Sequence, residues 1–195
     1  MGLNNSQKPA IFLNVKGGKL AQKSNTGEGT KFEYVDTETN EVKETWYNTF
    51  DSLDCVFEGI RFNNGSKFGE QLMVFAKDID SDEKYIITMN TDSDYACDFM
   101  KRLPSVSKGQ MITIRPVESD SEKLDEKGQP FKNRFMAIKD LETEEKIKSI
   151  YSEENPLPQW ETKTVNRKKV LDKENYLNAL IEGVKELVIE KEVQA

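Results

Sequence analysis

The first fifty residues alternate short apolar runs with polar turns, a pattern typical of β-hairpins. An apolar run at 10–15 and its return at 20–23 flank a Lys-Gly-Gly-Lys turn, whose glycines permit a tight reversal. A second pair of runs, at 32–35 and 42–50, encloses a polar turn. The pattern therefore predicts two consecutive β-hairpins at the start of the chain.

Between residues 53 and 139 the pattern changes once from strand to helix and back. Apolar residues with helical spacing occupy the segment near 95–103, which follows Asp92 and Ser93 and stops at Pro104. Either Asp92 or Ser93 can cap the start of this helix. The other apolar segments are short and bounded by turn residues, and they predict strands at 53–62, 71–79, 84–90, 111–117 and 131–139.

Five short strands leave open edges, which closure into a Greek-key barrel removes. The order strand, strand, strand, helix, strand, strand looks like an OB-fold, whereas a split ferredoxin-like sheet needs two helices in its core repeat. We therefore predict a mainly β protein with an OB-fold-like five-stranded barrel at 51–140. An N-terminal hairpin extension precedes it at 1–50, and a charged linker with a C-terminal amphipathic helix follows at 141–195.

The region after Asp140 is more polar. It predicts a short charged helix at 142–150, an extended break at 155–160 and a basic cluster at 166–169. A final helix is predicted from about Lys173 to Glu192, with one apolar stripe formed by Tyr176, Leu177, Leu180, Ile181, Val184, Leu187 and Val188. We expect this stripe to pack on the barrel or on a second copy of the chain, and contact with a replication protein is the alternative.

Composition narrows the function classes. The 195 residues include no histidine and two cysteines, Cys55 and Cys97, which excludes Ser-His and Cys-His nucleophilic systems and leaves no zinc site. Paired aspartates at 80 and 82 and at 92 and 94 fall at turns or caps, where the backbone favours Asp. We predict a protein that is not an enzyme and carries no cofactor or metal; a Mg²⁺-dependent nuclease ranks last.

Charge and hydropathy indicate location and partners. No apolar run approaches the roughly 20 residues of a membrane span, and no secretory signal opens the chain, so we expect a cytoplasmic protein without a membrane partner. The net charge is −7, yet residues 1–31 carry five lysines against one glutamate. The acidic total argues against strong duplex binding, whereas a local basic stripe can still hold phosphates. The acidic loop at 118–129 is not expected to touch phosphate.

Aromatic and basic residues are mixed along the predicted barrel strands. Single strands are held by aromatic faces that stack bases and by cations that follow phosphates. In OB-folds the ligand crosses strands 2 and 3, where several such residues fall. The candidate groove residues are Arg61, Phe62, Lys67, Phe68, Phe75, Lys77, Lys84 and Tyr85. Lys16, Lys19 and Lys23 are expected to extend the groove by charge alone. Any one aromatic, such as Phe57, Phe75 or Tyr85, can instead belong to the core.

Four parts of the sequence form a further pattern: 11–15 with Gly17-Gly18-Lys19, 57–60, 95–104 and 154–160. Through these segments the sequence resembles bacteriophage single-stranded DNA-binding proteins of the OB-fold type. This resemblance implies a sequence-tolerant protein that coats single strands during replication or recombination in the host cytoplasm. Many such proteins end in an acidic tail with a hydrophobic tip, and the end of this chain at 191–195 lacks one. The alternative function is an OB-like protein-interaction module or inhibitor acting through its acidic surface.

Overall fold

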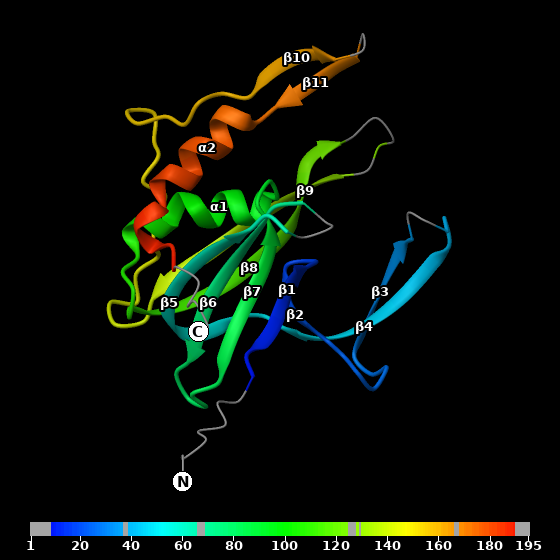
Figure 1. Ribbon diagram of the computed structural model, residues 1–195, viewed down its shortest axis with the longest axis vertical. Helices are drawn as coiled ribbons and strands as arrows, with labels where there is room; N and C mark the ends of the chain where they lie inside the picture. Colours follow the sequence, from blue (N-terminus) through cyan, green and yellow to red (C-terminus); the bar gives the residue numbers. More distant parts are fainter. Residues whose placement is uncertain are drawn as a thin grey trace.

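A computed structural model describes residues 9–36, 39–65, 69–124, 128, 130–165 and 168–189. Nine strands form one open mixed sheet, in the order β3-β4-β2-β1-β7-β6-β5-β8-β9 (Figure 1). Its strands are β1 (Ile11–Lys16), β2 (Lys19–Lys23), β3 (Thr30–Val35), β4 (Val42–Phe50), β5 (Leu53–Asn63), β6 (Gln71–Asp78), β7 (Lys84–Asn90), β8 (Met111–Leu124) and β9 (Pro130–Asp140). The mainly β prediction is confirmed.

The remaining elements lie on one side of this sheet. They are the helix α1 (Asp94–Arg102), the 3₁₀ turn η1 (Leu103–Ser105), the hairpin of β10 (Glu161–Val165) and β11 (Lys168–Asp172), the helix α2 (Glu174–Gly183) and the 3₁₀ turn η2 (Lys185–Leu187). Figure 1 shows α2 beside α1, with the β10–β11 hairpin extending from them. Within the described residues, no helix combines the length and the hydropathy needed to cross a bilayer.

The predicted order of strands and helix between residues 53 and 139 is confirmed. β5, β6 and β7 form an antiparallel meander, β8 returns to pair with β5, and β9 pairs with β8. The start of α1 is capped by Ser93, whose hydroxyl accepts a hydrogen bond from the Ala96 amide. Both N-terminal hairpins are also present, as β1–β2 and β3–β4.

Closure into a five-stranded barrel is not confirmed, because β1 occupies the edge of β7. β1 pairs with β7 in parallel, from Ile11 opposite Tyr85 to Asn14 opposite Thr88. In the described part of the chain β7 therefore pairs with β6 and β1, and β9 pairs with β8 and, through a single bridge at Lys139, with Lys146. Leu13 and Leu20 of the first hairpin are buried in the core, so burial of apolar surface holds this hairpin in the sheet.

The turn between β1 and β2 packs tightly against β8. Gly18 has φ +74°, and a Cβ there would lie 2.7 Å from the Glu118 nitrogen. Its own amide donates a hydrogen bond of 2.9 Å to the Tyr95 hydroxyl. Only glycine fits this approach, and the turn thereby links the N-terminal hairpin to β8 and to α1.

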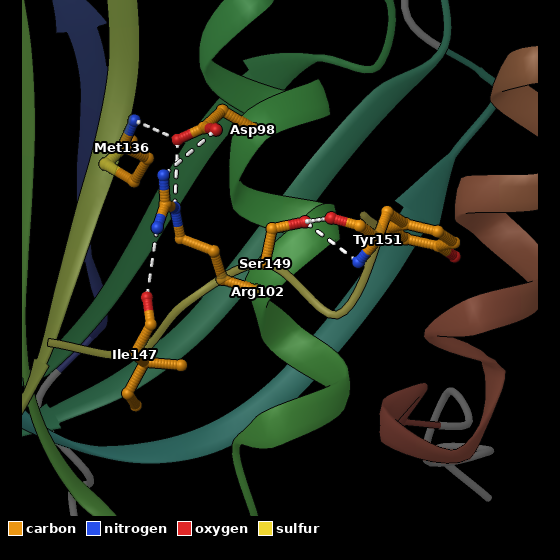
Figure 2. Close-up of polar contacts among 6 residues, drawn as sticks. All are labelled: Asp98, Arg102, Met136, Ile147, Ser149 and Tyr151. Atoms are coloured by element: carbon orange, nitrogen blue, oxygen red, sulfur yellow. Dashed lines mark hydrogen bonds and ion pairs between the residues drawn. The ribbon is translucent and has the colours of Figure 1, made fainter. Parts of the chain in front are cut away.

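The core fills the space between the sheet and α1. Its largest fully buried side chains include Phe57, Phe99, Leu72, Ile87 and Met100. The Asp98 carboxylate fixes α1 to β9, since it accepts the Met136 amide at 2.9 Å and two guanidinium hydrogen bonds from Arg102. Arg102 also donates to the Ile147 carbonyl at 3.0 Å, which holds the chain after β9 on the same helix (Figure 2).

The C-terminal helix packs on its own chain and is shorter than predicted. Tyr176, Leu180 and Val184 are buried against the core. The predicted helix from Lys173 to Glu192 is wrong beyond Gly183, where α2 ends. The chain then turns so that the Ile189 amide donates a 2.7 Å hydrogen bond to the Ile60 carbonyl. Pairing with the free part of β5 thus replaces the last helical turns, and residues 190–192 lie outside the described part.

Three further boundaries differ from the sequence prediction. The expected loop at 118–129 is largely strand, because β8 continues to Leu124 and β9 begins at Pro130. The expected helix at 142–150 is absent from the structure, which describes that whole segment. The Asp140 carboxylate accepts the backbone amides of Glu142 and Thr143 and forms a turn there instead. The β10–β11 hairpin was not predicted, and its second strand includes Lys168 and Lys169 of the basic cluster.

Candidate nucleic-acid interface

Strand register divides the sheet into two faces. Directly paired residues on neighbouring strands point to the same side, so the pairs can be followed from strand to strand. Leu13, Leu72 and Ile87 lie on the buried side under α1. We call the opposite side the outer face. On the six neighbouring strands β3, β4, β2, β1, β7 and β6 it comprises Phe12, Asn14, Lys16, Lys19, Ala21, Lys23, Thr30, Phe32, Tyr34, Lys43, Thr45, Tyr47, Thr49, Gln71, Met73, Phe75, Lys77, Lys84, Ile86, Thr88 and Asn90.

Together these six strands supply cations and no acidic residue to the outer face, whereas Asp54 of β5 lies on the same side as Val56, the residue opposite Lys77. Six of the residues just listed are lysines, and the list contains no Asp or Glu. Arg61 joins them from β5, where it pairs with Met73. The acidic residues of β3 and β4, Glu33 and Glu44, lie opposite each other on the other side, where both contact Lys31. The outer face is therefore locally positive although the protein is acidic overall.

The lysines of the outer face differ in their ionic partners. Lys19 lies 2.9 Å from Asp51 and Lys77 lies 2.8 Å from Asp82, in both cases with exposed partners from turns. Lys43 pairs with Asp36 at the end of β3. Lys16, Lys23 and Lys84 make no ion pair within the described residues. Exposed ion pairs are weak, so even the paired lysines can exchange their partner for a phosphate.

Aromatic rings lie between these cations. The Lys16 ammonium sits 5.0 Å from the centre of the Tyr47 ring and 5.7 Å from that of Phe32, and the two rings meet edge to face. The Arg61 guanidinium lies 5.1 Å from the centre of the Phe75 ring. Phe12 is 55% exposed and Tyr34 is 51% exposed. Large rings held open on a positive surface offer stacking positions for bases.

The structure separates the residues that the sequence grouped together. Arg61, Phe75, Lys77 and Lys84 lie on the outer face with Lys16, Lys19 and Lys23. Phe62 and Tyr85 lie on the opposite side and pack against the core, since they are paired with Leu72 and Ala76. Lys67 and Phe68 lie outside the described residues. Seven of the eleven candidate residues thus lie on the outer face, two lie partly buried on the opposite side, and two are outside the described residues.

The outer face also contains residues that the sequence analysis did not select. They are Phe12 of the first hairpin, which is expected to supply charge alone, and Phe32, Tyr34, Lys43 and Tyr47 of the second hairpin, for which no site residue is predicted. The sequence places Tyr47 and Trp46 on one strand but does not show which of the two points to the outer face. The alternation of Phe32 and Tyr34 along β3 was the available signal, because residues two apart share one face.

A polar hollow of 260 Å³ lies at one end of the outer face. Asn14, Lys16, Thr88 and Asn90 line it together with residues at the start of α1, including Tyr95. Side-chain amides and hydroxyls offer both donors and acceptors here. The hollow can therefore hold a polar group of a ligand that lies along the strands.

The chemistry of the two thiols is limited by burial. Burial raises the pKa of Cys55 to about 12 and that of Cys97 to about 11. Both groups are thus protonated at neutral pH, and the thiolate is the reactive form. The described residues contain no group of three or more His, Cys, Asp or Glu side chains placed to hold a metal ion.

Comparison with known proteins identifies no relative. No protein-family model matches the chain, and neither a curated protein nor a solved structure matches it. The resemblance to phage single-stranded DNA-binding proteins rests on the sequence segments named above and stays a prediction. The outer face is therefore interpreted from its own chemistry.

Proposed function

We propose that this protein binds single-stranded DNA in a sequence-tolerant way on its outer face. The observation that supports the proposal is one sheet face where lysines and aromatic rings alternate and where β3, β4, β2, β1, β7 and β6 contribute no carboxylate. Phosphates would lie along Lys16, Lys23 and Lys84, and bases would stack on exposed rings such as Phe12 and Tyr34. Both interactions recognise features common to every nucleotide, so they bind strands without reading the sequence.

The proposal includes an OB-like architecture for the central strands. The chain order β5, β6, β7, α1, β8, β9 is that of an OB-fold, whose ligands cross the second and third strands. These strands correspond to β6 and β7, which present Phe75, Lys77 and Lys84 on the outer face. In this proposal β1 and β2 widen the binding surface beyond the five central strands. The biological role we propose is the coating of strands during replication or recombination.

A titration of labelled oligo-dT tests the function. Fluorescence anisotropy with a strand of about 16 nucleotides, the upper site size of one OB-fold, measures the affinity. We expect the affinity to fall linearly with salt on a logarithmic scale, because bound phosphates release counterions. A duplex of the same length should bind more weakly, since its bases are not free to stack. Absence of binding at low salt would contradict the proposal and favour a protein-interaction module.

A further inference from the structure

A second concave surface lies on the helical side of the molecule, away from the outer face. It is a cleft of 280 Å³ between α1, β9 and the segment leading into α2. We call it the helical cleft; its lining residues are Asp94, Cys97, Asp98, Lys101, Lys132, Asn133, Arg134, Trp160, Lys173 and Tyr176. Its size is near the lower end of pockets that hold small molecules.

Cations dominate the helical cleft. Four of its lining residues are basic and two are acidic. One of the two, Asp98, is fully engaged by Arg102 and by the Met136 amide, as Figure 2 shows. Lys101 and Lys173 make no ion pair within the described residues. Burial raises the pKa of the Cys97 thiol in the cleft wall, and the charges of Lys173 and Lys101 partly offset this effect. The fields of both ammonium groups thus converge on the cleft.

Aromatic rings form the other part of the lining. Trp160 and Tyr176 meet edge to face with ring centres 5.8 Å apart. The Lys173 ammonium lies 4.4 Å from the Trp160 ring, and that of Lys101 lies 5.7 Å from the Tyr176 ring. Trp160 nevertheless remains 45% exposed. A half-open indole beside two ammonium groups combines the two chemistries that a nucleotide needs, a planar surface for its base and cations for its phosphate.

We propose that the helical cleft binds a nucleotide, with its base against Trp160 and its phosphate between Lys101 and Lys173. The site goes beyond the outer face and is physically separate from it. A hollow of 490 Å³ between the two surfaces is lined by Asp92, Asp94 and Glu118 with a single cation, Arg134. This acidic boundary repels phosphate, so one strand does not pass directly from the outer face into the cleft. The cleft therefore receives a separate nucleotide, a strand end or a second strand.

Intrinsic fluorescence tests the site, because the protein has two tryptophans. Trp46 lies on β4, so the variant W46F leaves Trp160 as the reporter. We expect dTMP to quench this fluorescence in a saturable way, and thymidine and inorganic phosphate each to bind more weakly. Adding K101A and K173A should weaken dTMP binding by about tenfold or more, since two charge-assisted contacts are lost. Circular dichroism confirms that each variant is folded.

Three outcomes would overturn the inference. They are no saturable quenching by dTMP, equal binding by inorganic phosphate and dTMP, and unchanged affinity in the K101A/K173A variant. The outer-face variant K16A/K23A/K84A serves as the matched control and should leave dTMP quenching unchanged. If oligo-dT fails to bind the outer face while dTMP still binds the cleft, the proposed function fails and the helical cleft stands on its own.

Discussion

Two long hairpins, β3–β4 and β8–β9, extend from the sheet (Figure 1), and they arrange similar charges in different ways. In β3–β4 the facing glutamates lie on the side away from the outer face, and the outer face keeps Phe32, Tyr34 and Tyr47. In β8–β9 acidic and basic residues face each other directly. Glu118 lies opposite Arg134 at 2.8 Å, and Asp120 lies opposite Lys132 with a short ion pair.

The comparison shows that register decides which side chains a ligand on the outer face would meet. Cross-strand neighbours of opposite charge neutralise each other, whereas charges on opposite faces of one hairpin do not meet. The β8–β9 hairpin therefore stabilises itself and presents little net charge. The β3–β4 hairpin pairs its own lysines, Lys31 with two glutamates and Lys43 with Asp36, but it leaves its rings open on the outer face. The outer-face lysines without an ion pair among the described residues come from β1, β2 and β7. Four experiments test this difference.

The largest expected effect comes from Lys16, Lys23 and Lys84, the outer-face lysines that make no ion pair among the residues that the structure describes. Each phosphate neutralised on a single strand contributes about 0.7 to the salt slope, so K16A/K23A/K84A should lower the slope by about 2 and the affinity at about 0.1 M salt by roughly 100-fold. Anisotropy titrations over a salt series measure both. The control K31A/K163A/K185A removes three lysines that are ion-paired away from the outer face. Equal losses in both variants would show that only net charge matters.

The next effect tests stacking on the β3–β4 hairpin. Tyr34 and Val35 are adjacent, similarly exposed at 51% and 55%, and point to opposite faces. Y34A should cost about 1 to 3 kcal/mol of binding free energy to oligo-dT, the range for a lost base stack. V35A is the matched control and should change the affinity by less than about twofold. A larger loss of oligo-dT affinity in V35A than in Y34A would mean that the DNA binds the opposite face of the hairpin.

A smaller gain should follow when the β8–β9 hairpin loses its internal neutralisation. E118Q/D120N frees Arg134 and Lys132, which line the helical cleft. We expect dTMP affinity to rise by up to about fivefold, because an exposed ion pair competes only weakly with a ligand. The control S119A changes the residue between these two carboxylates, which lies on the other side of β8 and outside the cleft lining. Lower dTMP affinity in E118Q/D120N would mean that the carboxylates position the cations and do not mask them.

The smallest effect concerns Lys19, which Asp51 partly neutralises. The Lys19 ammonium keeps the pKa of Asp51 below its ordinary value of 3.8. Lowering the pH from about 7 to 5 therefore leaves Asp51 ionised, and substitution is needed to free the lysine. D51N should raise oligo-dT affinity by about twofold, as expected for an exposed pair. D80N, in a turn, removes an equal charge as the control, and an equal gain there would exclude a specific effect at Lys19.

Local patterns in the sequence were enough to predict most elements. The alternation of apolar residues located both N-terminal hairpins and β5 to β7, and Ser93 with Pro104 bounded α1. These features depend on residues close in sequence, so no long-range contact is needed to infer them. The same alternation also implies that Arg61 and Phe62, or Lys84 and Tyr85, cannot share one face. It does not say which member of each pair points outward.

Only the tertiary structure decided the faces and the pairings between distant segments. The parallel pairing of β1 with β7 joins residues about 70 positions apart, and it determines that Lys16 and Phe75 share the outer face. The end of α2 is likewise determined by a contact with a segment distant in sequence, because Val188 pairs with Ile60 of β5 and does not continue the helix. These pairings and helix ends depend on the total apolar area that distant segments bury together. No local stretch of the sequence shows that total.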